Sequence, residues 1–139
     1  MRKIIICSHG NLAQGMLNTL EMIVGHTGNI EAYCAYVNED EAIDEMLQPI
    51  LKMNQGNELF VLTDIFGGSV NNEWMKALPE NPNIHLIAGM NLPFLIDLVT
   101  RMEDSKDVDA LIESCMANAI SSFTYCNKLE LDECDDTEF

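Results

Sequence analysis

The sequence has 139 residues, which is the length of one ordinary domain and enough to bury a core without disulfide or metal support. Apolar residues make up 47% of the chain, and the formal net charge at pH 7 is -16. This composition excludes an intrinsically disordered chain, and the charge argues against nucleic acid as a partner, because nucleic-acid surfaces are met by lysine and arginine.

The apolar runs and the cysteines together indicate a location. No apolar run approaches the roughly 20 residues needed to cross a bilayer, and the run after Arg2 and Lys3 is too short for the core of a signal peptide. The five cysteines are odd in number and include no C-x-x-C pair, which argues against a disulfide framework or a zinc site. We therefore expect a cytoplasmic protein with reduced thiols.

Strand-like and helix-like segments alternate along the chain, as judged from β-branched runs and from apolar residues at helical spacing. In chain order, the expected elements are a strand at 3–8, a helix at 11–24, a strand at 30–37, a helix at 39–53, a strand at 58–63, a helix at 69–78, a strand at 84–88, a helix from 91 or 92, a helix at 107–119 and a short last strand at 121–125. Asn38 and Ser69 are expected N-caps, and Pro49 predicts a kink or a new turn in its helix.

This alternation predicts the fold class. Strands separated by helices of this length form βαβ units with right-handed crossovers, so we expect an α/β fold with an open, mainly parallel, doubly wound sheet flanked by helices. The expected strand order is 2-1-3-4. In such sheets ligands bind beyond the carboxyl ends of the strands, where the strand order reverses.

The last residues differ in composition from the rest. Between Glu130 and Phe139 there are six acidic residues and no basic residue. We expect one domain at 1–128, followed by an acidic tail at 129–139 that is solvated and does not pack.

Polar residues and glycines gather at the predicted carboxyl ends of two strands. The residues concerned are Ser8, His9 and Gly10 after the first strand, and Thr63, Asp64, Gly67, Gly68 and Ser69 after the third. If these strands are neighbours, His9 and Asp64 lie about one strand spacing apart, roughly 5 Å between backbones, which allows a hydrogen bond between their side chains.

Such a histidine–aspartate pair has a clear chemical use. An aspartate that accepts a hydrogen bond from one ring nitrogen fixes the imidazole tautomer and leaves the other nitrogen as a nucleophile. Phosphoryl transfer needs mainly positioning and charge stabilisation. The helix N-termini near Gly10 and Ser69 can supply N–H groups that stabilise the charge. Gly67 and Gly68 allow the backbone to approach the phosphoryl group closely. Taken singly, each of these residues also has an ordinary explanation as a loop, turn or cap residue. Their combination favours a site.

The remaining histidines are interpreted as structural or surface residues. His26 stands beside a helix-ending glycine, and His85 lies inside the fourth predicted strand. The three histidines lack the spacing of metal ligands, so we expect neither a metal nor another cofactor.

Three blocks of the sequence resemble a known family, the mannose-family enzyme IIA components of the bacterial phosphoenolpyruvate-dependent sugar phosphotransferase system. The segment 4–15 is similar to the family's phosphorylation motif, and 20–25 continues the similarity. The segments 62–69 and 88–95 resemble its second and third signatures, in the same order and spacing. Val70 stands where the family pattern has proline, a difference that bears on the start of the helix at 69–78.

The resemblance implies a role and partners. Members accept a phosphoryl group from the phosphocarrier protein HPr and pass it to an enzyme IIB component, which phosphorylates sugar entering through a membrane permease complex. His9 matches the phosphorylated histidine and Asp64 its aspartate partner, while Thr63, Gly68 and Ser69 match the neighbourhood of the phosphoryl site. The family forms homodimers that exchange a C-terminal strand, for which the segment 121–125 is the candidate here.

Two other functions remain open on the sequence. The phosphocarrier subunit of dihydroxyacetone kinase shares this fold and the histidine after the first strand. A regulatory or binding module of flavodoxin-like architecture without enzymatic activity is the second alternative. Incubation with enzyme I, HPr and phosphoenolpyruvate discriminates, because only a carrier becomes labelled.

Overall fold

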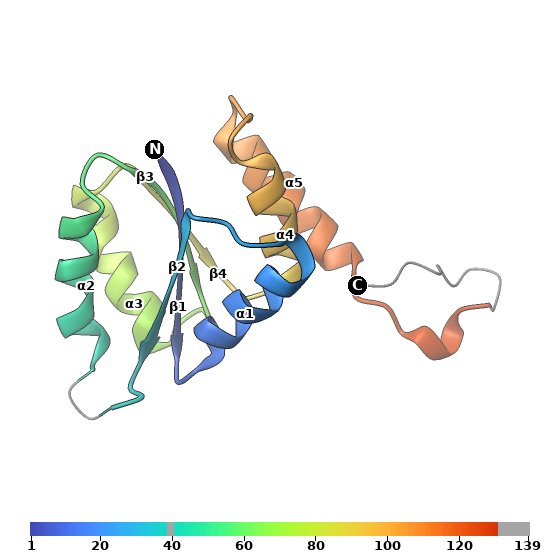
Figure 1. Cartoon of the computed structure of the whole chain (residues 1–139), viewed down its shortest axis with the longest axis horizontal. Helices are drawn as coiled ribbons and strands as arrows, with labels where there is room; N and C mark the ends of the chain where they lie inside the picture. The colour runs from blue at the N-terminus through green and yellow to red at the C-terminus, as the bar shows by residue number, and fades with distance from the viewer. Residues whose placement is uncertain (39–40, 131–139) are drawn as a thin grey trace.

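The computed structural model describes residues 1–38 and 41–130 of the chain. The elements of this part are β1 (Arg2–His9), α1 (Leu12–Val24), β2 (Ile30–Ala35), α2 (Ile43–Met53), β3 (Glu58–Thr63), α3 (Ser69–Ala77), the 3-10 turn η1 (Leu78–Glu80), β4 (Ile84–Ala88), α4 (Leu92–Arg101), α5 (Val108–Ser121) and the 3-10 turn η2 (Cys126–Lys128) (Figure 1). They alternate as the sequence predicts.

The four strands form one parallel sheet in the order β2-β1-β3-β4, which confirms the predicted topology. Cys7 of β1 pairs with Tyr33 of β2 on one side and with Thr63 of β3 on the other. The chain leaves β1 toward β2 and later crosses to β3, so the strand order reverses between β1 and β3. The residues that follow these two strands therefore lie at the edge where sheets of this kind bind ligands.

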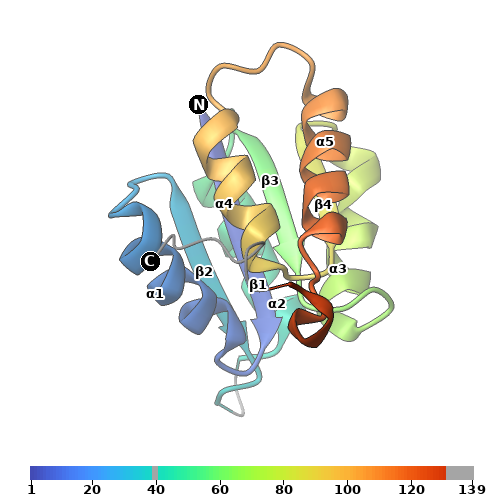
Figure 2. The ribbon, with the colours of Figure 1, turned by 90° about the vertical axis from the view of Figure 1, so that its right-hand side faces the viewer.

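Helices cover both faces of the sheet, with α2 and α3 on one side and α1, α4 and α5 on the other (Figures 1 and 2). The side chains of β1 alternate between the two layers: Ile4 and Ile6 join the core under α4, whereas Ile5 and Cys7 join the core that contains Trp74. Burial on both faces explains why β1 is a continuous apolar run rather than an alternating one.

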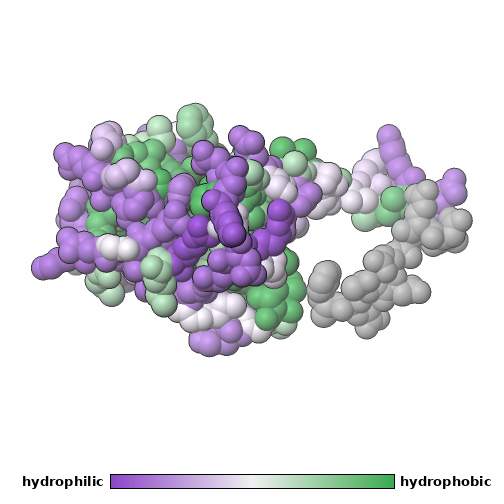
Figure 3. Space-filling model, turned by 90° about the horizontal axis from the view of Figure 1, so that it is seen from above, coloured by the Kyte–Doolittle hydropathy of each residue, from purple (hydrophilic) through white to green (hydrophobic). Residues whose placement is uncertain are grey.

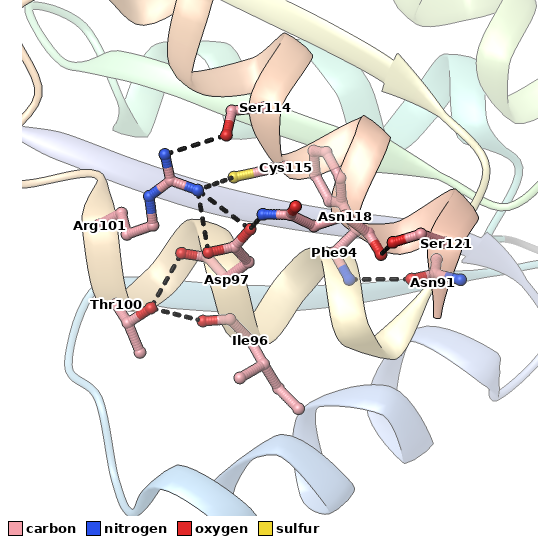
Figure 4. A network of polar contacts seen from close by, with 10 residues as sticks. All are labelled: Asn91, Phe94, Ile96, Asp97, Thr100, Arg101, Ser114, Cys115, Asn118 and Ser121. Atoms are coloured by element: carbon pink, nitrogen blue, oxygen red, sulfur yellow. Dashed lines mark hydrogen bonds and ion pairs between the residues drawn. The ribbon is translucent and has the colours of Figure 1, made fainter. Parts of the chain in front are cut away.

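A polar network joins α4 to α5 on the second layer (Figure 4). The Arg101 guanidinium donates to both carboxylate oxygens of Asp97 at 3.1 Å and to Ser114 Oγ at 3.1 Å, and Asn118 Nδ2 donates to Asp97 at 2.9 Å. Burial alone would raise the pKa of Asp97, but the hydrogen bonds from Asn118 and Arg101 hold it below its ordinary value. The ionised carboxylate thus connects the two helices.

One predicted helix start and two predicted N-caps are wrong. The helix expected from 39 begins at Ile43, and Ala42 rather than Asn38 stands at its N-cap. The reason is a turn after β2, in which Tyr36 N–H donates to Glu41 O at 2.8 Å. The helix α3 begins at Ser69 as the sequence predicts, but Gly68 rather than Ser69 is its N-cap, so the Ser69 side chain is free for another contact. Val70, the next residue, is fully buried.

The strand expected at 121–125 is absent from the single described chain. Ser121 ends α5, Ser122 follows as its C-cap, and 123–125 lead into η2 without pairing to the sheet. Residues 121–130 are exposed, and the segment after α5 projects away from the sheet (Figure 1). A strand needs a neighbour with a free edge, and in the described part of the chain this segment pairs with neither edge of its own sheet. Exchange with a second subunit remains a prediction, and residues 131–139 of the predicted tail lie outside the described part.

The surface at the amino-terminal ends of the strands is largely hydrophilic, with smaller apolar patches between the polar side chains (Figure 3). Among the helices that the structure describes, none has both the length and the apolar character to cross a membrane.

Candidate functional site

The structure brings His9 and Asp64 together at the predicted edge of the sheet. His9 is the last residue of β1, and Asp64 follows the last residue of the neighbouring parallel strand β3. His9 Nδ1 lies 2.7 Å from Asp64 Oδ2. The side chain of His9 is 44% exposed, whereas that of Asp64 is only 12% exposed. The aspartate thus lies beneath an accessible imidazole.

Asp64 is surrounded by N–H donors. Its Oδ2 accepts from the backbone N–H of His9 at 2.8 Å and from the ring, and its Oδ1 accepts from Ile65 N–H at 3.0 Å. Burial would raise the pKa of Asp64, but the backbone and side-chain hydrogen bonds from His9 hold it below its ordinary value. The carboxylate is therefore ionised at neutral pH and can only accept. It follows that His9 Nδ1 carries the proton and that Nε2 of the neutral ring carries the lone pair.

Ser69 lies on the other side of the imidazole. Its Oγ is 3.1 Å from His9 Nε2, the nitrogen with the lone pair. Ser69 therefore contributes to the predicted site as a hydroxyl beside Nε2. Because it is the first residue of α3, the N–H groups of the first helical turn, which have no intrahelical partner, begin beside it.

The sequence analysis missed Tyr36, which completes this arrangement. The Tyr36 ring stacks on the His9 ring with centroids 5.4 Å apart and planes 28° apart, and its hydroxyl donates to Ser69 Oγ at 3.0 Å. The sequence pattern predicts Tyr36 inside the second strand, at 30–37. Its position could have identified it as a site residue. The carboxyl ends of all parallel strands meet at one edge of the sheet, and Tyr36 directly follows β2.

Gly68 is required for the close approach of the loop to the imidazole. A Cβ built at Gly68 would lie 2.9 Å from Ile65 Cγ2 and 3.3 Å from His9 Cε1. Gly67, directly before it, has a φ of 84°, a conformation that glycine adopts readily. The two glycines therefore shape the turn between Asp64 and α3 so that it closes over the edge of the ring.

The other predicted neighbours hold the frame of the site. Ser8 is fully buried, and its Oγ accepts from Ala13 N–H at 2.8 Å, which ties the start of α1 to β1. The Gly10 N–H is already used, since it donates to Ala35 O at 2.8 Å. Thr63 is also fully buried, and its hydroxyl donates to Asn71 Oδ1 at 2.8 Å, which ties α3 to β3.

The other two histidines lie in different surroundings. His85 stacks on Phe60 and lies 3.2 Å from Glu58, and His26 pairs with Glu21 at the surface. Within residues 1–38 and 41–130, no group of three or more His, Cys, Asp or Glu side chains is placed to hold a metal ion. The chemistry that the described site supports is that of an exposed imidazole nucleophile with an ionised carboxylate behind it.

A family model described as the PTS system fructose IIA component matches residues 3–116, the segment that contains all of these residues. The chain belongs to this family. PTS denotes the phosphotransferase system for sugars, so the chain is a IIA component of such a system, in the mannose and fructose class.

Relatives of this IIA component are named as components of sugar phosphotransferase systems. It is 28% identical to the fructose-specific EIIA component of Bacillus subtilis over 92% of this chain and 88% of the relative. It is 27% identical over 78% of its length to the mannose-specific EIIAB component of Escherichia coli, of which it spans about a third (34%).

Solved structures confirm the fold of the IIA component. A proposed PTS permease from Klebsiella pneumoniae superposes with a TM-score of 0.85 at 39% identity, over 91% of this chain and 92% of the other. The mannose/sorbose-specific IIA subunit of Enterococcus faecalis superposes with a TM-score of 0.77 at 29% identity, over 94% and 98% of the two chains.

Proposed function

We propose that this IIA component is a phosphohistidine carrier, which accepts a phosphoryl group from phospho-HPr on His9 Nε2 and passes it to an enzyme IIB component. The observation that carries the proposal is the hydrogen bond between His9 Nδ1 and the ionised Asp64. It leaves Nε2 with a lone pair on an exposed ring at the carboxyl edge of the sheet.

The transfer step balances on the groups of the site. The Nε2 lone pair forms a bond to phosphorus, the bond between phosphorus and the donor breaks, and its electron pair returns to the donor. The ring then has a substituent on Nε2 and a proton on Nδ1, so it is an imidazolium. Asp64 offsets that positive charge, and the Ser69 hydroxyl and the N–H groups of the first turn of α3 stabilise the phosphoryl oxygens. Transfer to the acceptor runs the same steps in reverse.

Membership of the family supports the choice of partners. An enzyme IIB component is favoured as acceptor over a dihydroxyacetone kinase, because the matched family model and the relatives named above are sugar PTS components. In this role the protein acts as a phosphotransferase in the cytoplasm and contacts the permease complex only through IIB. We also propose that it is a homodimer, as the resemblance implies.

Exposed apolar side chains stand close to His9 and Asp64 in the sequence and suit a docking surface. Leu12 opens α1 directly after the His9 turn, and Ile65 and Phe66 follow Asp64 in the loop that leads to α3. All three are exposed, with Phe66 at 75%. Large exposed apolar side chains around a reacting group are typical of a surface that a partner protein covers during transfer.

Labelling tests the carrier function. The purified chain is incubated with enzyme I, HPr and phosphoenolpyruvate, and the acid-labile phosphate is located by mass spectrometry. We expect it on His9, no labelling of His9→Ala, and normal labelling of the matched controls His26→Gln and His85→Gln. Phosphate on His26, His85 or a cysteine would contradict the assignment, and an unlabelled chain would favour the regulatory module.

A further inference from the structure

Tyr36 has an unusual backbone conformation. Its φ is 62°, and among residues 1–38 and 41–130 it is the one non-glycine residue with positive φ. A bulky aromatic residue rarely adopts this conformation. The Tyr36 N–H donates to Glu41 O, which holds the turn. Strained residues of this kind persist where their surroundings determine them, and they cluster at functional sites.

The conformation places Tyr36 on the reacting group. The ring stacks on the imidazole of His9, and the hydroxyl reaches Ser69 Oγ at 3.0 Å, which in turn lies 3.1 Å from His9 Nε2. Three residues at the ends of β2 and β1 and at the start of α3 therefore form a continuous hydrogen-bonded chain that ends on one nitrogen.

The direction of every hydrogen bond in this chain is determined. Asp64 can only accept, so Nδ1 of His9 carries a proton, and in the neutral ring that acts as nucleophile Nε2 can only accept. Ser69 has a single hydroxyl proton, which must then point to Nε2. The remaining lone pairs of Ser69 Oγ can only accept, so Tyr36 is the donor. The tyrosine hydroxyl thus occupies an acceptor lone pair of Ser69 Oγ and supports the orientation in which the serine proton points to Nε2.

We propose that Tyr36 is a positioning residue for phosphoryl transfer, whose hydroxyl holds the Ser69 hydroxyl as a donor at His9 Nε2 and then at the phosphoryl group. This inference rests on the proposed carrier role of His9. When the bond between Nε2 and phosphorus forms and the bond to the donor breaks, the Ser69 proton stays on its oxygen and changes acceptor from Nε2 to a phosphoryl oxygen. Tyr36 keeps its proton and its bond to Ser69.

The test begins with Tyr36→Phe, which removes one oxygen and keeps the stacked ring. We expect kcat for phosphorylation by phospho-HPr to fall roughly three- to tenfold, the effect of one misdirected hydrogen bond. KM for the donor should stay unchanged, because the apolar surface is intact. Tyr33→Phe is the matched control from the preceding strand: its hydroxyl donates to Glu31, away from His9, and we expect an unchanged kcat.

A double-mutant cycle separates positioning from a structural role. Because Tyr36 acts through Ser69, we expect Tyr36→Phe to cause no further loss in a Ser69→Ala background. Nitrogen NMR of His9 gives a second readout: Tyr36→Phe should shift the Nε2 resonance while the Nδ1–H signal persists.

The outcomes that overturn the inference are distinct from those that overturn the carrier function. An unchanged kcat in Tyr36→Phe, or an equal loss with and without Ser69, contradicts the role of Tyr36 alone. Failure of the unaltered chain to accept phosphate on His9 contradicts the proposed function itself.

Discussion

At the scale of single residues, one carboxylate organises the site. Asp64 lies under the imidazole and accepts three N–H groups, two from His9 and one from Ile65. Its charge sets the tautomer of His9 and balances the imidazolium that forms when Nε2 is phosphorylated. Both effects depend on the carboxylate being ionised rather than on the space that it fills.

Replacing Asp64 by asparagine should therefore separate the effect of the carboxylate charge on phosphorylation from the effect of the side chain's shape. The amide has almost the same size and can still accept the His9 backbone N–H, but it neither fixes the ring proton on Nδ1 nor offsets the imidazolium. We expect the rate of phosphorylation to fall on the order of 10²-fold or more, as happens when such an orienting carboxylate is lost in other enzymes. Rapid-quench measurement of phosphate transfer checks this, and an unchanged rate would show that the contact plays no part in transfer.

The same residue predicts a pH dependence of stability. The folded pKa of Asp64 lies below its ordinary value of 3.8, so the folded state binds this proton less readily than the unfolded chain. Its stabilising contribution is complete above about pH 4 and is lost as the pH falls through the folded pKa. We expect the difference in free energy of unfolding between the parent and Asp64→Asn to decline below pH 4. Urea unfolding from pH 7 to pH 3 measures it, and a constant difference would contradict the lowered pKa.

Gly68 offers a test of fit against the imidazole. In Gly68→Ala the new methyl group meets His9 Cε1 at 3.3 Å and the exposed Ile65 side chain at 2.9 Å; the isoleucine can move, but the ring must tilt. We expect a stability loss of about 1 kcal/mol or less, because the N-cap of α3 changes from glycine to alanine, together with a severalfold slower transfer. Gly28→Ala is the control, since nothing lies within 4 Å of its Cβ and neither property should change.

At the scale of elements, buried strands were predicted best. The strands at 58–63 and 84–88 match β3 and β4 in both bounds, because burial and the flanking turns delimit them. The second strand ends two residues before its predicted end, because Tyr36 takes a left-handed conformation. No local sequence pattern predicts this conformation. Residues 121–125 have high strand propensity. This propensity reflects only how well the side chains suit a pleated sheet, and it does not provide the neighbouring strand with which the segment must pair.

The site was predictable in part for the same physical reason. His9 and Asp64 follow strands whose order the βαβ pattern fixes, so their proximity follows from topology. The contacts of Ser69 and Tyr36 depend on side-chain directions at a helix start and a turn. Ser69 was expected as a cap, but Gly68 holds that position, and the freed hydroxyl faces the imidazole instead.

The network between α4 and α5 makes a prediction at this scale. Asp97→Ala removes the acceptor that Arg101 and Asn118 share, so Asn118 loses this hydrogen bond and Arg101 keeps only its contacts to α5. Because these side chains are partly exposed, we expect a moderate loss of about 1–2 kcal/mol in the free energy of unfolding, with little change in the labelling of His9. Urea unfolding is the measurement. Lys76→Ala, which breaks an exposed surface pair with Glu73, should leave the midpoint nearly unchanged, and an equal effect of the two changes would contradict the role of the network.

At the scale of the whole molecule, β2 and β4 are the edges of the sheet, and each has an unpaired side. Edges of this kind pair readily with another chain. Beside Asp64 and the carboxyl end of β4 lies an open, mostly apolar hollow of about 360 Å³, whose lining includes Met90, Phe94, Ile120 and Phe123. The last two are exposed in the single chain. These features suit an added segment from a partner.

We therefore expect a homodimer in which the segment 121–125 of each chain pairs with the edge of the other. Exchange of identical segments about a two-fold axis covers both edges and buries exposed side chains such as Phe123 at little cost beyond ordering the hinge. The protein should sediment as a dimer at low micromolar concentration. Removing residues 121–139 should give monomer or aggregate, whereas removing 131–139 alone should leave the dimer intact. A stable, soluble dimer of the shorter chain would place the interface elsewhere, because the exchanged segment would then contribute nothing to association.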